Sequence, residues 1–239
     1  MRITHDDYTN AIEAHPFLPI YISGNAKGLV CTWNFNQMAD KSLSQWILDK
    51  DTPPNQANVK KTTVKKLEFN SYGDRFGALN TGGQFFIMAF DLETSSKVEP
   101  LYTTMHTTRL NETRLSDFAF LDRDSIVAGV SLRDRVLNVY DTLLPPRQSL
   151  VQVHKAGNGG NLMQVLPDSH KVLCFNAKPG YITEYDLRKE GEFTTSKLLT
   201  KEEITAVALN PAQDSLVLGQ ADGIVKIFDL KASSQPAAP

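Results

Sequence analysis

The sequence predicts an all-β fold of the β-propeller type, and two regularities of its repeats support this prediction. An aromatic residue followed by Asn or Asp returns five times, at intervals of 43 to 57 residues. These aromatic residues are Trp33, Phe90, Tyr140, Tyr185 and Phe228. An apolar segment ends 19 to 21 residues before each of them, whereas the stretches between units vary more in length. Self-similarity at this period is typical of propellers and solenoids.

The last unit shows why each repeat should contain three core strands. Residues 204–209 and 215–219 are apolar segments separated by a turn containing Pro211, which fixes φ. Residues 220–223 predict a tight hairpin of the Asp-Gly kind. Residues 224–228 are the third strand. The other four units align with this one, and their first strands are expected to end near Ala14, Phe69, Phe120 and Val165.

A fourth, outer strand is expected in most units, at residues 43–48, 98–105 and 193–199. The expected units span residues 8–48, 62–105, 114–150, 160–199 and 203–230 of a propeller domain that covers residues 1–230. Residues 2–5 could supply the outer strand of the last unit and close the ring, whereas an open ring would leave a strand edge unpaired. The tail, residues 231–239, is low in apolar bulk and is expected to be disordered. An irregular β-sandwich is the alternative fold.

Length and composition are those of a single globular β domain. The chain has 239 residues, of which 41% are hydrophobic and 22% are charged. The net charge of −2 gives no indication of nucleic-acid binding. No apolar run approaches the ~18 residues of a membrane span, and the first residues lack the apolar core of a signal peptide. Cys31 and Cys174 fall in different units, which predicts no disulfide framework and fits a cytoplasmic protein.

The residues that could carry chemistry form no recognisable catalytic or metal site. The histidines are His5, His15, His106, His154 and His170, and none has a Cys or His partner at zinc spacing. No nucleophile motif accompanies them, so a structural role is expected for each. The glycine-rich segment 155–160 lacks the order of a phosphate-binding loop. We therefore expect no enzyme, no metal and no cofactor.

The connections that enter the innermost strands are the expected binding face, because in a propeller they gather near the central channel. These connections carry Arg109, Arg114, His154, Lys155 and Asn161. Arginine is a frequent anchor of protein interfaces. A solvated rim is the alternative interpretation. The densest basic patch consists of Lys60, Lys61, Lys65 and Lys66, which are either solvated or in contact with an acidic protein surface or anionic lipid.

The five units resemble WD (WD40) repeats, although the Trp-Asp pair is never complete. Trp33 is followed by Asn34, and the hairpin Asp found at Asp222 is replaced by Lys27 and Pro179 in other units. The hydrogen-bond network of the family is therefore not expected to be intact, and apolar packing must supply most of the stability. Five repeats are few for such a ring, in which seven are usual, so we expect a small or incomplete ring.

A narrower resemblance is to the C-terminal propeller of DmX-like proteins, also called rabconnectin-3. It is carried by residues 15–24, 64–77, 116–120, 141–146 and 149–151. The resemblance implies a scaffold in the assembly machinery of the vacuolar-type proton pump, the RAVE complex, and hence a role in organelle acidification. It implies partners among the pump subunits or assembly factors. It also implies a cytoplasmic location that can include the surface of endosomes and vacuoles.

Two other functions stay open at this point. The same fold could serve in a microtubule-associated, ciliary or vesicle-coat complex. A propeller hydrolase would need convergent acid, base or metal ligands at the central channel, and the sequence does not show them. The sequence favours no particular oligomeric state.

Overall fold

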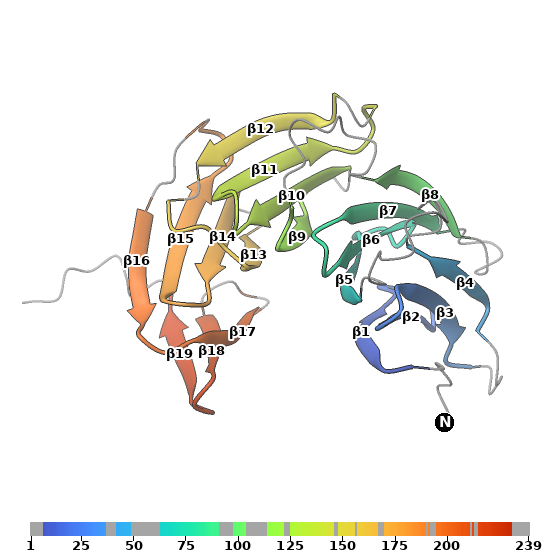
Figure 1. The fold of residues 1–239 in the computed structure, drawn as a ribbon, viewed down its shortest axis with the longest axis horizontal. Coiled ribbons are helices and arrows are strands. Elements are labelled where there is room, and N and C mark those ends of the chain that lie inside the picture. Colours follow the sequence, from blue (N-terminus) through green and yellow to red (C-terminus); the bar gives the residue numbers. More distant parts are fainter. Residues whose placement is uncertain are drawn as a thin grey trace, which may run out of the picture. The chain divides into compact units, whose positions relative to one another are not determined.

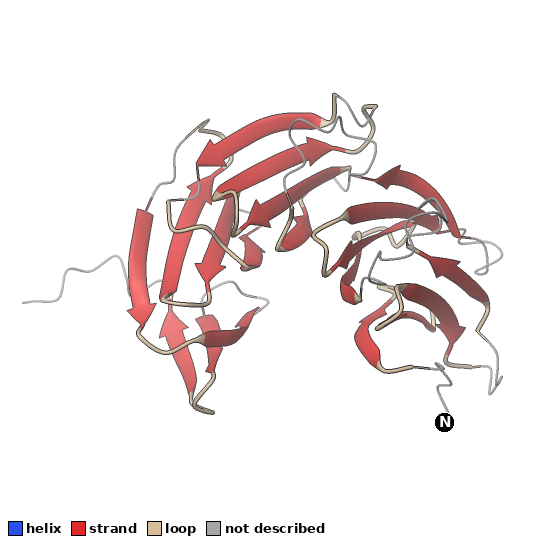
Figure 2. Ribbon diagram, viewed as in Figure 1, coloured by secondary structure: helices blue, strands red, loops and turns tan. Residues whose placement is uncertain are grey.

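The computed structural model describes residues 7–36, 42–48, 63–90, 98–103, 114–121, 125–145, 148–155, 157–166, 170–189, 191, 195–210, 212 and 215–230. Every regular element in these ranges is a β-strand (Figure 2). The strands form five sheets that follow one another along the chain, as the labels of Figure 1 show. The expected all-β fold with five repeats is thus confirmed.

Four sheets contain four described strands and the fifth contains three. The first sheet has the order β1 (Thr9–Ala14), β2 (Ile20–Asn25), β3 (Leu29–Asn34) and β4 (Ser44–Ile47). The second has the order β5 (Val64–Phe69), β6 (Arg75–Asn80), β7 (Phe85–Phe90) and β8 (Val98–Thr103). The third has the order β12 (Leu150–Lys155), β11 (Val136–Asp141), β10 (Ile126–Ser131) and β9 (Asp117–Phe120). The fourth is β13 (Leu162–Leu166), β14 (Lys171–Asn176), β15 (Gly180–Asp186) and β16 (Thr195–Thr200), and the fifth is β17 (Ile204–Leu209), β18 (Ser215–Gln220) and β19 (Val225–Asp229).

The strand positions follow from the repeat pattern. The first strands end at the expected residues in four sheets, and β13 ends one residue beyond Val165. All five repeat aromatics lie in the third strand of their sheets, at Trp33, Phe90, Tyr140, Tyr185 and Phe228. The outer strands β4 and β8 lie in the predicted segments, and β16 ends one residue beyond the segment predicted for it. Alternating apolar residues bounded by Pro, Gly, Asn and Asp turns were therefore sufficient signals for these elements.

The outer strand β12 of the third sheet corrects one expectation. The third unit is expected to end at residue 150, and His154 and Lys155 are expected in the connection to the next unit. They instead continue a strand that begins at Leu150, beyond the expected end of the third unit. Outer strands are half solvated, so polar residues at alternate positions are compatible with them. The expected closing strand at residues 2–5 and the tail at residues 231–239 lie outside the described residues.

The chain divides into two compact units. The first unit comprises residues 1–115, 123–127 and 141–150, and the second comprises residues 116–122, 128–140 and 151–239. Within the first unit, apolar side chains of the first two sheets form one core cluster: Ile20, Ile22, Val30, Leu48, Val64, Leu67, Phe69, Phe76, Ala78, Phe86 and Met88. Within the second unit, one cluster joins β9–β11 to the fourth sheet, and another joins the fourth sheet to the fifth. Burial of this apolar surface is the main stabilising term.

Amide side chains at the ends of second strands fix two of the hairpins where a WD repeat would use its hairpin Asp. Asn25 Oδ1 accepts hydrogen bonds from the backbone N–H groups of Lys27 and Leu29, both at 2.9 Å. Asn80 Oδ1 accepts one from the N–H of Gln84 at 3.0 Å. The hairpin glycines Gly28 and Gly83 have φ of 77° and 80°, values that favour glycine. The local chemistry differs from the WD consensus, yet it produces the same tight turns.

Candidate interaction surfaces

The predicted binding residue Arg114 lies in the first unit, beside the hairpin of the second sheet. Its side chain is exposed. The next residue, Leu115, donates its N–H to the carbonyl of Gly83 at 3.0 Å. The connection that enters the third sheet therefore lies against the β6–β7 hairpin, as expected for a propeller rim. Arg109, predicted for the same surface, lies outside the described residues.

Lys155 and Asn161 lie in the second unit. Lys155 is exposed at the end of β12, and its N–H is 3.3 Å from the carbonyl of Gly191. Asn161 is half-buried, and its Oδ1 accepts the N–H of Ala177 at 2.7 Å. The Asn161 side chain therefore already holds the β14–β15 hairpin. Of these two residues, Lys155 has the side chain more accessible to a partner.

His154 does not belong to an exposed binding surface. Its side chain is 0% exposed, because it points inward from β12. The ring makes an edge-on contact with Tyr185 at a centroid distance of 6.0 Å, and Nε2 lies 3.3 Å from Gln152 Oε1. The sequence predicted His154 as a partner-binding residue, whereas in this structure its side chain is buried and not exposed to a partner. The physical reason is burial of the ring beside Tyr185 of β15, in the fourth sheet.

A second candidate surface lies in the first unit, at the turns between first and second strands. Phe17 is 74% exposed in the β1–β2 turn, and Tyr72 is 67% exposed in the β5–β6 turn. Phe35 follows β3, is 55% exposed and packs on Tyr21 at a centroid distance of 4.6 Å. We call Phe17, Phe35 and Tyr72 the aromatic turn edge. Aromatic side chains are enriched where proteins bind one another, so this edge is suited to docking.

His15 connects the two turns that carry Phe17 and Tyr72. Its Nδ1 accepts the N–H groups of Phe17 and Leu18 at 3.1 and 3.0 Å, and its Nε2 lies 3.1 Å from the carbonyl of Gly73. A nitrogen that accepts two N–H groups carries no proton, so the ring is neutral and Nε2–H is the donor to Gly73. Burial lowers the pKa of His15, and the hydrogen bond to Gly73 acts in the opposite direction.

The aromatic turn edge was missed in the sequence because its residues were assigned to turns. The usable signal was the residue type. Turns favour Gly, Pro, Asn, Asp and Ser, so an aromatic residue beside Pro16 or Gly73 is unusual. The contact made by His15 could not be foreseen, because it joins residues 58 positions apart.

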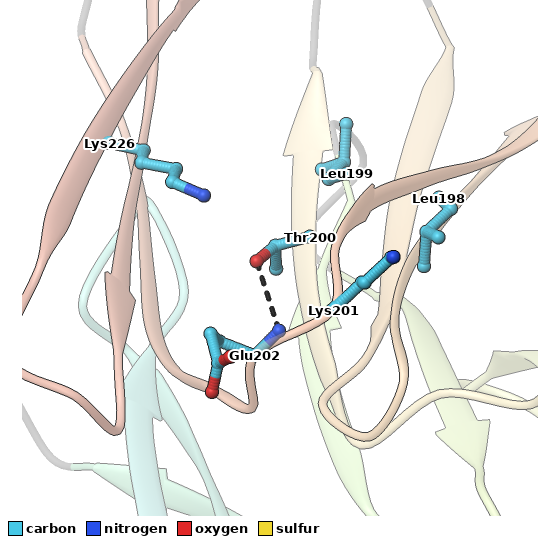
Figure 3. A pocket seen from close by; sticks show the side chains of 6 residues that line it. All are labelled: Leu198, Leu199, Thr200, Lys201, Glu202 and Lys226. Atoms are coloured by element: carbon cyan, nitrogen blue, oxygen red, sulfur yellow. Dashed lines mark hydrogen bonds between the residues drawn. The ribbon is translucent and has the colours of Figure 1, made fainter.

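The described residues offer little for catalysis. Among them, no group of three or more His, Cys, Asp and Glu side chains could hold a metal ion. An open hollow of about 410 Å³ is lined by Leu198, Leu199, Thr200, Lys201, Glu202 and Lys226 (Figure 3). Three of these six side chains are charged, whereas small-molecule sites are mostly apolar and enclosed. The hydrogen bond from the Glu202 N–H to Thr200 Oγ1, at 3.1 Å, shapes the connection that borders the hollow.

The carboxylate of Asp186 is held in a close ion pair with Arg188. Arg188 donates from Nε and Nη2 to the two oxygens of Asp186, at 2.8 and 2.7 Å. These hydrogen bonds hold the pKa of Asp186 far below its usual range. A carboxylate paired in this bidentate way is a poor general acid or base.

Both cysteines are buried thiols. Burial raises the pKa of Cys31 to about 11 and raises the pKa of Cys174 as well. Because the thiolate is the reactive form, we expect neither to react with a maleimide at pH 7.5 while the chain is folded. In denaturant, both should react within minutes. Mass spectrometry of the folded and unfolded samples measures this, and fast labelling of either residue in the folded chain would contradict the burial.

Comparison with known proteins shows a similarity to DmX-like proteins. Within the described residues there is no helix long and apolar enough to span a membrane. No family model matches the sequence. The chain is 26% identical to mouse DmX-like protein 1 over 230 residues, which is 92% of the chain, and 26% identical to its human counterpart over 225 residues. It spans 7% of the length of each of these relatives.

A solved structure supports the same fold. The chain superposes on Saccharomyces cerevisiae Sqt1, a WD40 protein, with a TM-score of 0.69 over 95% of its length and 60% of the other chain, at 11% identity. The expected WD40 fold and the expected resemblance to DmX-like proteins are therefore both confirmed. The chain has a WD40-type β-propeller fold with five sheets and is related in sequence to DmX-like protein 1.

Proposed function

We propose that this chain is a non-catalytic protein-interaction module that takes part in assembling the vacuolar-type proton-pumping ATPase. The observation that carries the proposal is the similarity to DmX-like protein 1 over 92% of the chain, a length that includes parts of all five sheets. The chain corresponds to 7% of that protein, so the role assigned here is that of one module among others. Such a module acts at the cytoplasmic face of endosomes and vacuoles.

The surfaces of the chain support binding better than catalysis. Exposed aromatic residues and turn edges are the features that protein partners use, and the exposed side chains of Phe17, Phe35 and Tyr72 form the aromatic turn edge. We therefore place the docking of a pump subunit or assembly factor at Phe17, Phe35 and Tyr72. The competing positions are Arg114 in the first unit and Lys155 in the second unit, both of which were expected from the sequence.

Affinity purification of the tagged chain from cells with an active vacuolar pump tests both statements. We expect mass spectrometry to recover subunits of the ATP-hydrolysing sector or their assembly factors. The double variant Phe17→Ser/Tyr72→Ser should lower this recovery at least tenfold. Both side chains are exposed, so the substitutions remove contact area without opening the core.

The matched control is the double variant Arg114→Ala/Lys155→Ala, which alters one exposed residue in each unit. It should leave recovery unchanged. Loss of recovery in the control alone would move docking from the aromatic turn edge to Arg114 or Lys155. Recovery of tubulin-associated, ciliary or coat proteins without any pump component would contradict the proposed role.

A further inference from the structure

One face of the fifth sheet is apolar and exposed. The register pairs Ala208 with Val217 and Val217 with Ile227, and it pairs Ala206 with Gly219 and Gly219 with Val225. Directly paired residues of neighbouring strands point to the same side of a sheet. Val225 is 63% exposed and Ile227 is 73% exposed. We call these six residues, Ala206, Ala208, Val217, Gly219, Val225 and Ile227, the open face.

The opposite face of the same sheet is an ordinary core. Leu216 and Leu218 are buried there and pack with Leu173, Phe175 and Ile182 of the fourth sheet. The fifth sheet therefore has one satisfied apolar face and one exposed apolar face. A sheet that is apolar on both sides normally packs between two layers.

The open face corresponds to a sheet–sheet interface in two other repeats. In the first sheet, Ile22 and Val30 stand at the repeat positions of Val217 and Val225, and both are buried against the second sheet. In the fourth sheet, Leu173 and Ile182 stand at these positions and are buried against the fifth. The open face thus continues a series of interfaces that the same chain already uses for stacking one sheet on the next.

The first and fifth sheets have a glycine at the same repeat position, and this glycine indicates the shape of a partner surface that would pack on the open face. Gly24 in β2 and Gly219 in β18 stand at the same repeat position. A Cβ added to Gly24 would collide with Cγ1 of Val64, the first residue of the next sheet, so Val64 fills the notch that Gly24 leaves. A Cβ added to Gly219 would have its nearest neighbours in its own sheet, Thr205 Oγ1 at 3.5 Å and Ala206 Cβ at 3.6 Å. The notch at Gly219 is open.

We propose that the open face binds a further blade of the same type, supplied by a partner protein. The partner is an antiparallel sheet with an apolar face, and its innermost strand begins with a β-branched residue that enters the notch at Gly219. Val64 and Ile204 are the residues of this kind that begin the second and fifth sheets, and both are buried at the equivalent contacts. The six residues of the open face include no charged side chain, and the next pair on the same side, Ser215 and Asp229, lies at the end of the strands, where the exposed Asp229 can stay in water beside an apolar partner face.

The comparison with Sqt1 is consistent with such an addition. Nearly all of this chain superposes on 60% of the Sqt1 chain, so a WD40 protein of similar fold carries a substantial part beyond these five sheets. The inference rests on the fold and the open face alone. It stands independently of the proposed role in pump assembly.

The experiment uses a single thiol placed on the open face. Ile227→Cys adds an exposed reporter thiol, while the native cysteines are buried. The probe is the full chain extended at its end by a second copy of residues 63–103, which brings a blade whose first strand begins with Val64. Joining the probe to the chain gives it a high effective concentration. We expect maleimide labelling of the reporter thiol to be at least tenfold slower in the extended chain than in the unextended chain.

Three controls make each outcome decisive. A Leu143→Cys reporter, on an exposed turn of the first unit, should label at the same rate in both chains. An appended copy carrying Val64→Asp should give no protection, and neither should a chain carrying Val217→Asp. If the Val64-containing copy also gives no protection, the open face does not accept a blade and the inference is overturned.

Protection of the reporter thiol in the unextended chain would also overturn it. If that protection is independent of protein concentration, another part of the same chain, such as residues 2–5, covers the face. If it grows with concentration, a second copy of the chain is the occupant. Rapid labelling at all concentrations, followed by protection in the extended chain, is the result expected for a face kept for another protein.

Discussion

Replacing Gly24 by alanine is expected to lower the free energy of unfolding by about 2 to 3 kcal/mol, at the upper end of overpacking effects. The added methyl group would lie 2.6 Å from Cβ of Val64 and closer still to its Cγ1. Rotation of the Val64 side chain cannot relieve the contact with Cβ, so the second sheet must shift away from the first. Urea unfolding followed by tryptophan fluorescence measures the change, because Trp33 and Trp46 lie in the first sheet.

Gly219→Ala is the matched control, because it makes the same chemical change at the same repeat position. Its methyl group meets only ordinary contacts at 3.5 and 3.6 Å, so the expected change is within about 0.5 kcal/mol. Val64→Ala combined with Gly24→Ala should recover at least about 1 kcal/mol relative to the sum of the single changes, because the two sites are in contact. Equal effects of Gly24→Ala and Gly219→Ala would contradict the difference between the two notches.

Apart from β12, the sequence was sufficient to predict the described strands and their order along the chain. Local signals determined them: alternation of apolar residues, the turn residues around Pro211 and Gly223, and the aromatic that recurs in each third strand. These signals act over a few residues, so they survive even where the WD consensus is lost. The missed strand β12 shows the limit of this method, because the half-solvated position of an outer strand permits residues such as Gln152 and Lys155 that are typical of loops.

The surfaces were less accessible to sequence analysis, because burial depends on which sheet packs on which. His154 was assigned to a rim and is buried, whereas Phe17 was assigned to a turn and is among the more exposed apolar residues. The same repeat position is buried at Val30 and exposed at Val225, although both residues are valine. Residue type predicts that a side chain can be buried, and only the neighbouring sheet decides whether it is.

His15 should make the junction between the first two turns sensitive to pH. A proton on Nδ1 would point at the N–H groups of Phe17 and Leu18, which that nitrogen accepts in the folded chain. The pKa of His15 is lowered on folding, so the unfolded chain binds the proton more readily. The contribution of His15 to stability is therefore complete well above its ordinary pKa of about 6.5, and it is lost as the pH falls from there through the lowered pKa.

His15→Asn and His15→Ala separate the proton effect from packing. Asn70 and Asn210 occupy the same repeat position and accept turn N–H groups through Oδ1, so the asparagine variant should keep part of the local bonding. We expect His15→Ala to cost about 2 to 3 kcal/mol at pH 7.5, through lost hydrogen bonds and the lost edge-on contact with Phe69, and His15→Asn to cost about 1 kcal/mol.

The decisive measurement is urea unfolding of the native chain and both variants at pH 7.5, 6.5 and 5.5. Other groups also titrate, including Glu13, whose pKa is raised by burial. Subtracting the stability of each variant from that of the native chain at each pH removes the contribution that these groups make to both. The stability advantage of the native chain over His15→Asn should shrink as the pH falls. A histidine at position 15 can take up a proton in this range, whereas an asparagine cannot. An advantage that stays constant across the three pH values would mean that the folded ring accepts the proton without losing its contacts, and the neutral Nε2–H form assigned from the hydrogen bonds would be wrong.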